Sequence, residues 1–276
     1  MRIHKEQFHV HKKNEFENFL SGSRIQLPSN CDSVRIDVGL AGEAPNSAKW
    51  LLETKNRFVI GIEPIDHHWD MLCEFETADT DRPYPDFPLL QLSKNSIEHN
   101  KKNICSINSR FFGIQCAISD VESLVYSKFY QMDRSGGASG SSSLLEPTEI
   151  HPHTLESVST VPTVPLSTIL NKLDFSEPIE HIKTDCEAHD FNVVKSLNHH
   201  IENVCFVTSE MTVNNMHHKG AYNHEEFLDF MSDKGFCIIR RRWGIFAVNM
   251  GEVHFMNKRL KNTIKSKKYK STTFGL

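Results

Sequence analysis

The feature that most constrains the fold is a repeating order of short apolar runs and helical segments. Five runs have the composition of buried strands: VRIDVG (34–39), FVIGIEP (58–64), FFGIQCAISD (111–120), EHIKTDCE (180–187) and NVCFVTSE (203–210). The segments PNSAKWLLETKN and DFNVVKSLN, which follow the first and fourth runs, place apolar residues at helical spacing. Strand and helix in alternation predict a mostly parallel sheet with helices on both faces.

The C-terminal part follows a different pattern. NHEEFLDFMSDKG (223–235) predicts a capped helix, and the runs FCIIRRRWG and GEVHFMNKR come after it. Too few residues separate these two runs for a helical crossover, so we expect them to pair antiparallel. The predicted fold is therefore α/β, with a mostly parallel sheet and an antiparallel C-terminal hairpin.

We expect one domain over residues 1–276, with four atypical parts: an N-terminal extension (1–30), inserts at 77–103 and 123–165, and a basic tail (257–276). The first insert is irregular because it is rich in proline. The second alternates around RSGGASGSSS, which predicts a small hairpin with a flexible loop over residues 135–143. Seven Lys/Arg and no acid occur in 257–270. A solvated tail is the expected structure, and binding to nucleic acid or to an anionic surface is the alternative.

The chain has no signal-peptide pattern and no apolar run near the roughly 18 residues that span a bilayer. Its seven cysteines are scattered without a Cys-x-x-Cys motif, which is typical of reduced thiols in a cytoplasmic protein. Paired histidines such as His67-His68 and His217-His218 are poor chelators because adjacent side chains point apart. We predict no metal site.

Acidic residues follow the strand-like runs one after another. Asp37, Glu63, Asp120, Asp185 with Glu187, and Glu210 close the five runs in order. One such acid is most often a helix cap or a surface charge. Their recurrence favours a binding site, because open α/β sheets bind ligands beyond the carboxyl ends of their strands.

The first two runs indicate the kind of ligand. Glu63 lies 24 positions after Gly39 at the end of the second run, where a carboxylate can accept hydrogen bonds from ribose hydroxyls. Gly39 and Gly42 form either a tight turn or a close approach to a cofactor. The third glycine of a dinucleotide fingerprint is missing, and Glu43 would repel a phosphate. A nucleoside cofactor without phosphate, such as S-adenosylmethionine, fits better than NAD.

Seven stretches follow one another in a fixed order: RIDVG (35–39), FVIGIEP (58–64), CAISD (116–120), GSSSLLEP (140–147), VPTVPLSTIL (161–170), EHIKTDCEAHDFNVVKSL (180–197) and EVHFMNK (252–258). Together they resemble the FkbM family of S-adenosylmethionine-dependent methyltransferases. The resemblance covers about residues 34–258 and implies the class I methyltransferase fold, with seven strands of which the last is inserted antiparallel. It also implies O-methylation of a sugar or polyketide-type hydroxyl.

By position, the resemblance implies roles for individual residues. The cofactor-binding residues would be Asp37, Gly39, Gly42, Glu63, Ser119 and Asp120, and Lys183, Asp185 and Glu187 would lie near the transferred methyl. Two departures stand out: the first loop reads LAGEAPNS, and Ala188 replaces a common glycine.

A hydroxyl acceptor must lose a proton, so a general base is expected within hydrogen-bond reach of it. The candidates are Asp185, Glu187 and His189, with Asp185 first because it ends a strand. Paired carboxylates could also bind a divalent ion. We expect a small-molecule or saccharide acceptor, no nucleic acid and no membrane span; the oligomeric state is not indicated. The alternatives are an NAD-dependent oxidoreductase and a non-catalytic cofactor-binding module.

Overall fold

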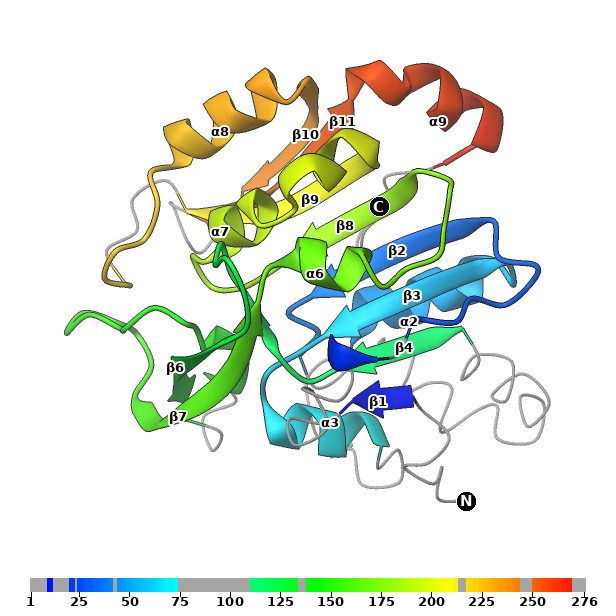
Figure 1. Cartoon of the computed structure of the whole chain (residues 1–276). Helices are drawn as coiled ribbons and strands as arrows, with labels where there is room; N and C mark the ends of the chain where they lie inside the picture. The colour runs from blue at the N-terminus through cyan, green and yellow to red at the C-terminus, as the bar shows by residue number, and fades with distance from the viewer. Residues whose placement is uncertain are drawn as a thin grey trace.

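The computed structural model describes residues 9–11, 20–22, 24–41, 44–73, 110–133, 138–212, 217–243 and 250–269. Its main feature is an eight-stranded sheet (Figure 1). In spatial order the strands are β1 (His9–His11), β4 (Phe111–Ile114), β3 (Arg57–Ile62), β2 (Ser33–Val38), β8 (Ile179–Thr184), β9 (Val204–Thr212), β11 (Met250–Asn257) and β10 (Phe236–Trp243).

The neighbouring strands β1, β4, β3, β2, β8 and β9 are parallel to one another. Strand β11 is inserted antiparallel between β9 and β10. Every residue of β2, β3, β4 and β8 is buried, as expected for strands with helices on both faces. The predicted parallel sheet and antiparallel C-terminal hairpin are confirmed. The short strand β1 extends the sheet beyond the seven strands that the resemblance implied.

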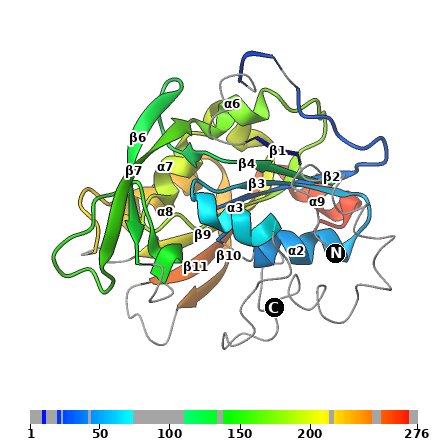
Figure 2. The same cartoon turned by 90° about the horizontal axis from the view of Figure 1, so that it is seen from below.

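Helices cover both faces of this sheet (Figures 1 and 2). One face carries α2 (Pro45–Glu53), α3 (Asp66–Cys73) and α9 (Lys261–Lys267), and the other carries α6 (Leu166–Leu170), α7 (Asp190–Lys195) and α8 (His224–Asp233). Buried aromatic side chains anchor them: Trp50 and Trp69 under α2 and α3, and Phe191 stacked on Phe227 between α7 and α8. No helix in the described residues is long and apolar enough to cross a membrane.

A second, three-stranded sheet lies beside the carboxyl edge of the first. It consists of β5 (Ala117–Ile118), β7 (Leu155–Val164) and β6 (Val125–Met132), with the 3₁₀ helix η2 (Ala138–Ser141) in the β6–β7 connection. The antiparallel β6–β7 pair confirms the hairpin predicted within 123–165. The predicted single strand over 111–120 is wrong, because the chain turns after Ile114 and continues into the other sheet. Insert 77–103 lies outside the described residues.

The basic segment after β11 is not a solvated tail as far as residue 269. It forms η4 (Lys258–Leu260) and α9, and buries Ile264 and Tyr269 against Cys205 and Phe206. The Tyr269 hydroxyl donates a hydrogen bond to the carbonyl oxygen of Asp32 at 2.9 Å. The amphipathic spacing of Ile264 and Tyr269 therefore outweighs the high charge of the segment.

A buried ion network lies near the amino ends of β2, β3 and β8. Glu180 accepts hydrogen bonds from Arg35 at 2.6 Å and from Arg57 at 3.1 and 3.2 Å. Arg57 also contacts Glu53 at 2.6 Å, and the Arg35 guanidinium lies 5.1 Å from the Trp50 ring centre. Two arginines thus neutralise the buried Glu180 and the more exposed Glu53.

Candidate active site

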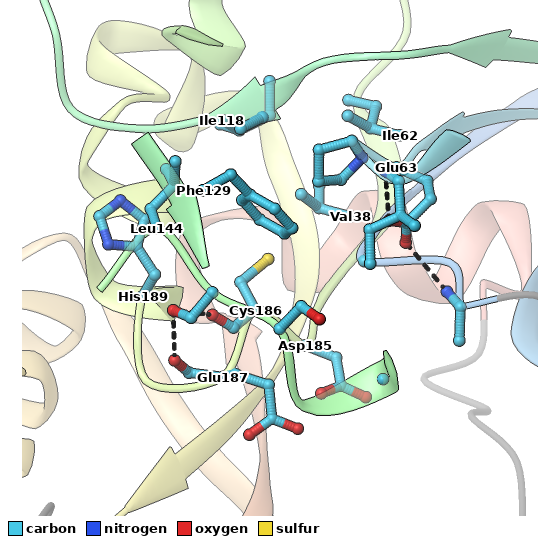
Figure 3. Close-up of a pocket in the computed structure, with 18 of the residues that line it drawn as sticks. Val38, Ile62, Glu63, Ile118, Phe129, Leu144, Asp185, Cys186, Glu187 and His189 are labelled. Carbon is cyan, nitrogen blue, oxygen red and sulfur yellow. Dashed lines mark hydrogen bonds between the residues drawn. The ribbon is translucent and has the colours of Figure 1, made fainter. Parts of the chain in front are cut away.

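A cavity of about 360 Å³ opens at the carboxyl edge of the main sheet (Figure 3). Its wall comes from the ends of β2, β3 and β9, from α3, from the loop after β8, and from β5, β6 and η2 of the small sheet. The volume lies within the range of about 300–1,000 Å³ that is typical of small-molecule sites. The cavity is where the strand-end acids predicted a ligand.

Gly39 is required by the approach of two loops. Its φ of 79° is unfavourable for other residues, and an added Cβ would lie 1.9 Å from the carbonyl oxygen of Asp185. The first loop and the loop after β8 therefore meet backbone to backbone. Gly39 makes room for this neighbouring loop while also lining the cavity. Gly42, the second predicted small residue, lies outside the described residues.

Asp37 ties the first loop to helix α2. Its Oδ2 accepts hydrogen bonds from the Ser47 hydroxyl at 2.7 Å and from the Ser47 backbone N–H at 3.1 Å. Ser47 therefore does not cap its own helix, and the residue before that helix is Ala44 in a left-handed conformation. Asp37 is buried and does not line the cavity.

Lys183 links the two loops at the floor of the site. Its Nζ donates to the Gly39 carbonyl oxygen at 2.9 Å and lies 3.2 Å from Asp185 and 3.5 Å from Asp37. Burial alone would lower the pKa of Lys183, but Asp185 and Asp37 raise it above the ordinary value. Lys183 does not line the cavity either, so with Asp37 it positions the loops that form the cavity.

Glu63 lies at the end of β3 and lines the cavity, and its side chain is buried. Its Oε2 accepts from the Ala41 N–H at 3.2 Å and its Oε1 from the Ile65 N–H at 2.9 Å (Figure 3). A carboxylate oxygen can accept more than one hydrogen bond, so this fixed carboxylate retains capacity for ligand hydroxyls. The position and chemistry fit the ribose of a nucleoside.

His68 is a site residue that the sequence reasoning did not select. It lies on helix α3, shortly after Glu63 in the chain. Its Nδ1 is 3.3 Å from Glu63 Oε1, and its Nε2 is 3.1 Å from the Ser139 hydroxyl on η2. It therefore connects Glu63 to the Ser-rich helix η2. The sequence signal was the His67-His68 pair, which we considered only as a metal ligand.

An apolar slot lies beside Glu63. Among the lining residues, Ile65, Ile118, Phe129 and Leu144 form it, and His189 also lines the cavity. Figure 3 shows Ile118, Phe129, Leu144 and His189 among the lining side chains. A mostly apolar slot next to a buried carboxylate has the chemistry that suits a purine base.

His189 and Ser119 form a pair at this apolar end. The His189 Nε2 and the Ser119 hydroxyl are hydrogen-bonded at 2.9 Å, and Nδ1 lies 3.3 Å from the Asn192 amide. Burial and, secondly, Lys195 lower the pKa of His189 to about 4. Both ring nitrogens are occupied, so His189 is poorly suited to act as a base. Asp120 points elsewhere: it pairs with Lys195 at 3.3 Å and does not line the cavity.

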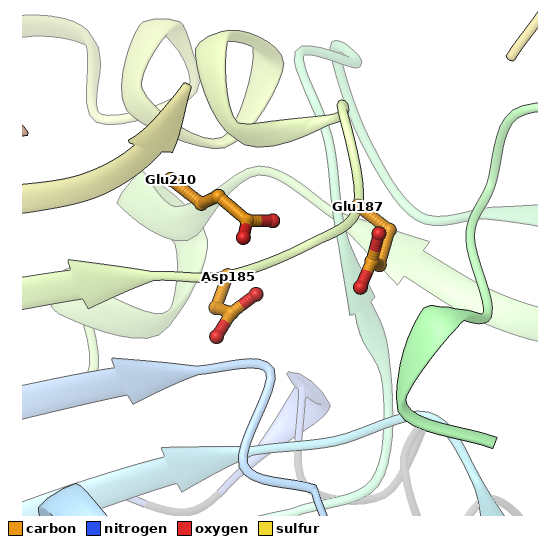
Figure 4. Close-up of side chains that lie close together, drawn as sticks. All are labelled: Asp185, Glu187 and Glu210. Carbon is orange, nitrogen blue, oxygen red and sulfur yellow. The ribbon is translucent and has the colours of Figure 1, made fainter. Parts of the chain in front are cut away.

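Three carboxylates gather at the other end of the cavity (Figure 4). Asp185 and Glu187 come from the loop after β8 and Glu210 from β9, and one oxygen of each lies within 4.8 Å of the others. Burial raises the pKa of Glu187 and of Glu210, and Asp185 raises both further. Glu210 was noticed as a strand-end acid but not selected as a site residue.

The loop that carries Glu187 is held in a strained conformation. Glu187 and Ala188 have φ values of 49° and 70°, and Ala188 stands where the family commonly has glycine. The Ser143 hydroxyl donates to the Glu187 carbonyl oxygen at 2.9 Å. Asp190 accepts from the Cys186 N–H at 3.3 Å, and burial, then Asp185, raises the pKa of Asp190 to about 7. Strain of this kind is typical of functional sites.

The strand order and the site define a class of protein. The order β4-β3-β2-β8-β9-β11-β10, with the last strand in sequence inserted antiparallel, is that of class I methyltransferases. The family model "Methyltransferase FkbM domain" matches residues 81–238, and the chain belongs to this family. It is an S-adenosylmethionine-dependent methyltransferase. The match includes the acid-bearing loop after β8 and Glu210, and it begins after β2 and β3.

Solved structures that resemble the chain include methyltransferases of low identity. TomG, an O-methyltransferase from Streptomyces achromogenes in complex with SAM, is 8% identical, with 81% of this chain and 73% of TomG covered and a TM-score of 0.40. A proposed rRNA-methylase from Clostridium thermocellum is 10% identical (88% and 93% covered, TM-score 0.41). Precorrin-6y C5,15-methyltransferase from Geobacter metallireducens is 10% identical (91% and 96%, TM-score 0.34). A search of the curated proteins finds no match.

Proposed function

We propose that the protein transfers a methyl group from S-adenosylmethionine to a hydroxyl oxygen of a small polyhydroxylated acceptor, such as a saccharide. One observation carries the proposal. A single cavity runs from Glu63 and the apolar slot to the Asp185, Glu187 and Glu210 carboxylates. Cofactor and acceptor can therefore meet inside it.

The residues present fit the cofactor. Glu63 would accept hydrogen bonds from the ribose, and the slot of Ile65, Ile118, Phe129 and Leu144 would hold the adenine. When bound, the cofactor supplies a methyl group on a positively charged sulfur. The chain's own task is to hold the acceptor in line with that methyl and to exclude water, because alignment contributes most to a displacement reaction.

The carboxylates supply the other half of the chemistry. The acceptor oxygen would receive the methyl group that the bound cofactor supplies. The hydroxyl proton must leave, and a carboxylate at the acceptor end can take it. Asp185 is the weaker candidate because it is paired with Lys183 at 3.2 Å. Glu187, whose pKa burial raises, replaces Asp185 as our first choice of base.

The same carboxylates favour one class of acceptor. Carboxylates accept hydrogen bonds from hydroxyl groups, and a saccharide presents several of these on one face. They would repel the phosphates of a nucleic acid, on which protein–nucleic acid affinity depends. The acidic wall thus supports a neutral, hydroxyl-rich small molecule.

The test measures transfer and binding separately. Purified protein is incubated with radiolabelled S-adenosylmethionine and a panel of saccharides, and S-adenosylhomocysteine binding is measured by calorimetry. The variants are Asp185→Asn and Glu187→Gln, and the exposed Glu226→Gln on α8 is the matched control. We expect transfer by wild type and control, and its loss with intact binding in Glu187→Gln. Tight binding without transfer to any hydroxyl compound would contradict the O-methylation proposal.

A further inference from the structure

We propose that Asp185, Glu187 and Glu210 form a binding site for one divalent cation of the hard type, Mg²⁺ or Ca²⁺, at the acceptor end of the cavity. The presence of the ion is independent of the proposed function, whereas its part in catalysis rests on that function. Three observations support the site: the spacing of the carboxylate oxygens, the Glu210 oxygen without a hydrogen-bond partner, and the excess of acidic over basic side chains around them.

The spacing fits a single ion. One carboxylate oxygen from each residue lies within 4.8 Å of the others, and Figure 4 shows the three side chains around a common space. Ligands on opposite sides of a Ca²⁺ ion are about 4.6–5.2 Å apart, and those of Mg²⁺ about 4.0–4.2 Å. The carboxylates therefore lie close enough to share one Ca²⁺ or Mg²⁺ ion after small side-chain adjustments. All-oxygen ligands of this kind suit hard cations.

Glu210 gives the second, independent observation. Its Oε2 is buried and has no hydrogen-bond partner among the described residues. The residue opposite it on β11 is Glu252, another acid. Buried polar atoms almost always have partners, because burial without one costs free energy. An ion between Glu210 and the other two carboxylates would supply the missing partner.

The balance of charge points the same way. Lys183 is already engaged by Asp37, Asp185 and the Gly39 carbonyl oxygen. In the part of the chain that the structure describes, no lysine or arginine forms an ion pair with Glu187 or Glu210. Two further carboxylates at the cavity wall thus have no cationic partner among the described residues, and a divalent ion would bind both.

The ion would act on the acceptor. Three carboxylate oxygens leave the remaining coordination positions of a six- to eight-coordinate ion open to water or to a substrate hydroxyl. A hydroxyl bound to a metal ion loses its proton more easily than a free one. The proton would pass to the second oxygen of a neighbouring carboxylate, and the acceptor oxygen would be fixed beside the methyl group.

The experiment measures ion binding directly. Full-length protein is stripped with a chelator and titrated calorimetrically with MgCl₂ and, separately, CaCl₂. We expect one ion per chain for the wild type and for the Glu226→Gln control. Glu210→Gln should weaken binding by at least about 10–100-fold, the loss typical even for residues that only support metal ligands. Circular dichroism checks that each variant is folded. If Glu210→Gln does not fold, the same loss of ion affinity is expected for Glu187→Gln, which then serves as the test.

Two results would overturn the site: no binding of either ion to the wild type, or equal affinity in the wild type and the folded variant. S-adenosylhomocysteine is titrated in parallel without metal. Cofactor binding and metal-free methyl transfer together with no ion binding would contradict this inference alone. Ion binding without any methyl transfer would leave the site standing and contradict the proposed function.

Discussion

The two edges of the main sheet differ in how their charged side chains are paired. At the amino edge, Arg35 and Arg57 contact Glu53 and Glu180 at 2.6–3.6 Å, so positive and negative charges are equal in number. At the carboxyl edge, Asp185, Glu187 and Glu210 face one another, and the ion pairs of that group in the described residues are those of Lys183.

The difference distinguishes charged residues that stabilise the fold from charged residues that are available to bind a ligand. A buried ion pair is tolerated when every member is paired, and removing one partner is strongly destabilising. A cluster of like charges in a cleft costs stability and is typical of functional sites. The contrast is testable because each edge contains a glutamate that can be changed to glutamine: Glu180, which is buried, and Glu210, which is half-buried.

The largest expected effect is on catalysis. Glu187→Gln cannot accept the acceptor proton, and losing a general base typically lowers the rate by about 10²–10⁴. Affinity for S-adenosylhomocysteine should stay close to that of the wild type. Single-turnover methyl transfer and calorimetry on the same preparation check this. Wild-type turnover in the variant would move the base to Asp185.

The next effect is on stability at the amino edge. Glu180→Gln leaves two buried guanidinium groups with one full negative charge, and breaking such a network costs about 3–5 kcal/mol. We expect a much lower denaturation midpoint, measured by urea unfolding. A Glu180→Gln protein as stable as the wild type would mean that the balanced network does not hold the fold.

A smaller effect concerns cofactor binding. Glu63→Gln keeps the shape of the side chain but removes its charge, and hydrogen bonds to a charged group contribute about 1.5–3 kcal/mol. Affinity for S-adenosylhomocysteine should fall roughly ten- to a hundredfold. Calorimetric titration measures the change, with Glu226→Gln as control. An unchanged affinity would exclude Glu63 from the ribose site.

The next prediction concerns His181 on β8, in the middle of the sheet, and the pH dependence of the protein's stability. His181 is fully buried, hydrogen-bonded to Thr208 at 2.9 Å, and burial, then Arg35, His254 and Arg57, lower its pKa well below the ordinary value. The pKa of His181 is lower in the folded than in the unfolded protein. Its contribution to the free energy of unfolding is therefore complete above about pH 6.5 and is lost as the pH falls below that value. The loss is about 1.4 kcal/mol per pH unit.

The check compares the wild type with His181→Gln, which cannot be protonated. Urea unfolding at pH 6 and pH 5 should show a shallower loss of stability in the variant. Equal slopes would show that His181 takes up a proton in the folded protein.

The smallest effect is again at the carboxyl edge. In metal-free protein, Glu210→Gln removes one of the mutually repelling charges, so stability should stay equal or rise by up to about 1 kcal/mol. This is the opposite of the result expected for Glu180→Gln. A loss of several kcal/mol would mean that Glu210 supports the fold.

Much of the fold could be predicted from the sequence because long buried strands have a strong local signal. VRIDVG, FVIGIEP and the C-terminal pair of runs were identified in this way. Strand β5 and the break after Ile114 were missed, since two apolar strands separated by a two-residue turn have the pattern of one. The packing of Ile264 and Tyr269 was hidden by the surrounding lysines.

The site could be predicted in outline only. The strand-end position predicted that Glu63, Asp185 and Glu187 line one cavity, because parallel strands end at one edge. The same rule predicted that Asp37 and Asp120 also line the cavity, and neither does. Asp37 accepts a hydrogen bond from Ser47, and Asp120 pairs with Lys195. His68 and Ser139 were missed, since their contact joins segments 71 positions apart and has no local pattern.

The central claim is that the carboxyl edge binds the cofactor with its reactive end toward the acids. A crystal structure of the complex with S-adenosylhomocysteine tests this most directly. The account predicts the ribose hydroxyls on Glu63, the adenine between Ile118 and Phe129, and the sulfur facing the space between Asp185 and Glu187. A ribose bound away from Glu63, or a sulfur facing away from the acids, would contradict the account.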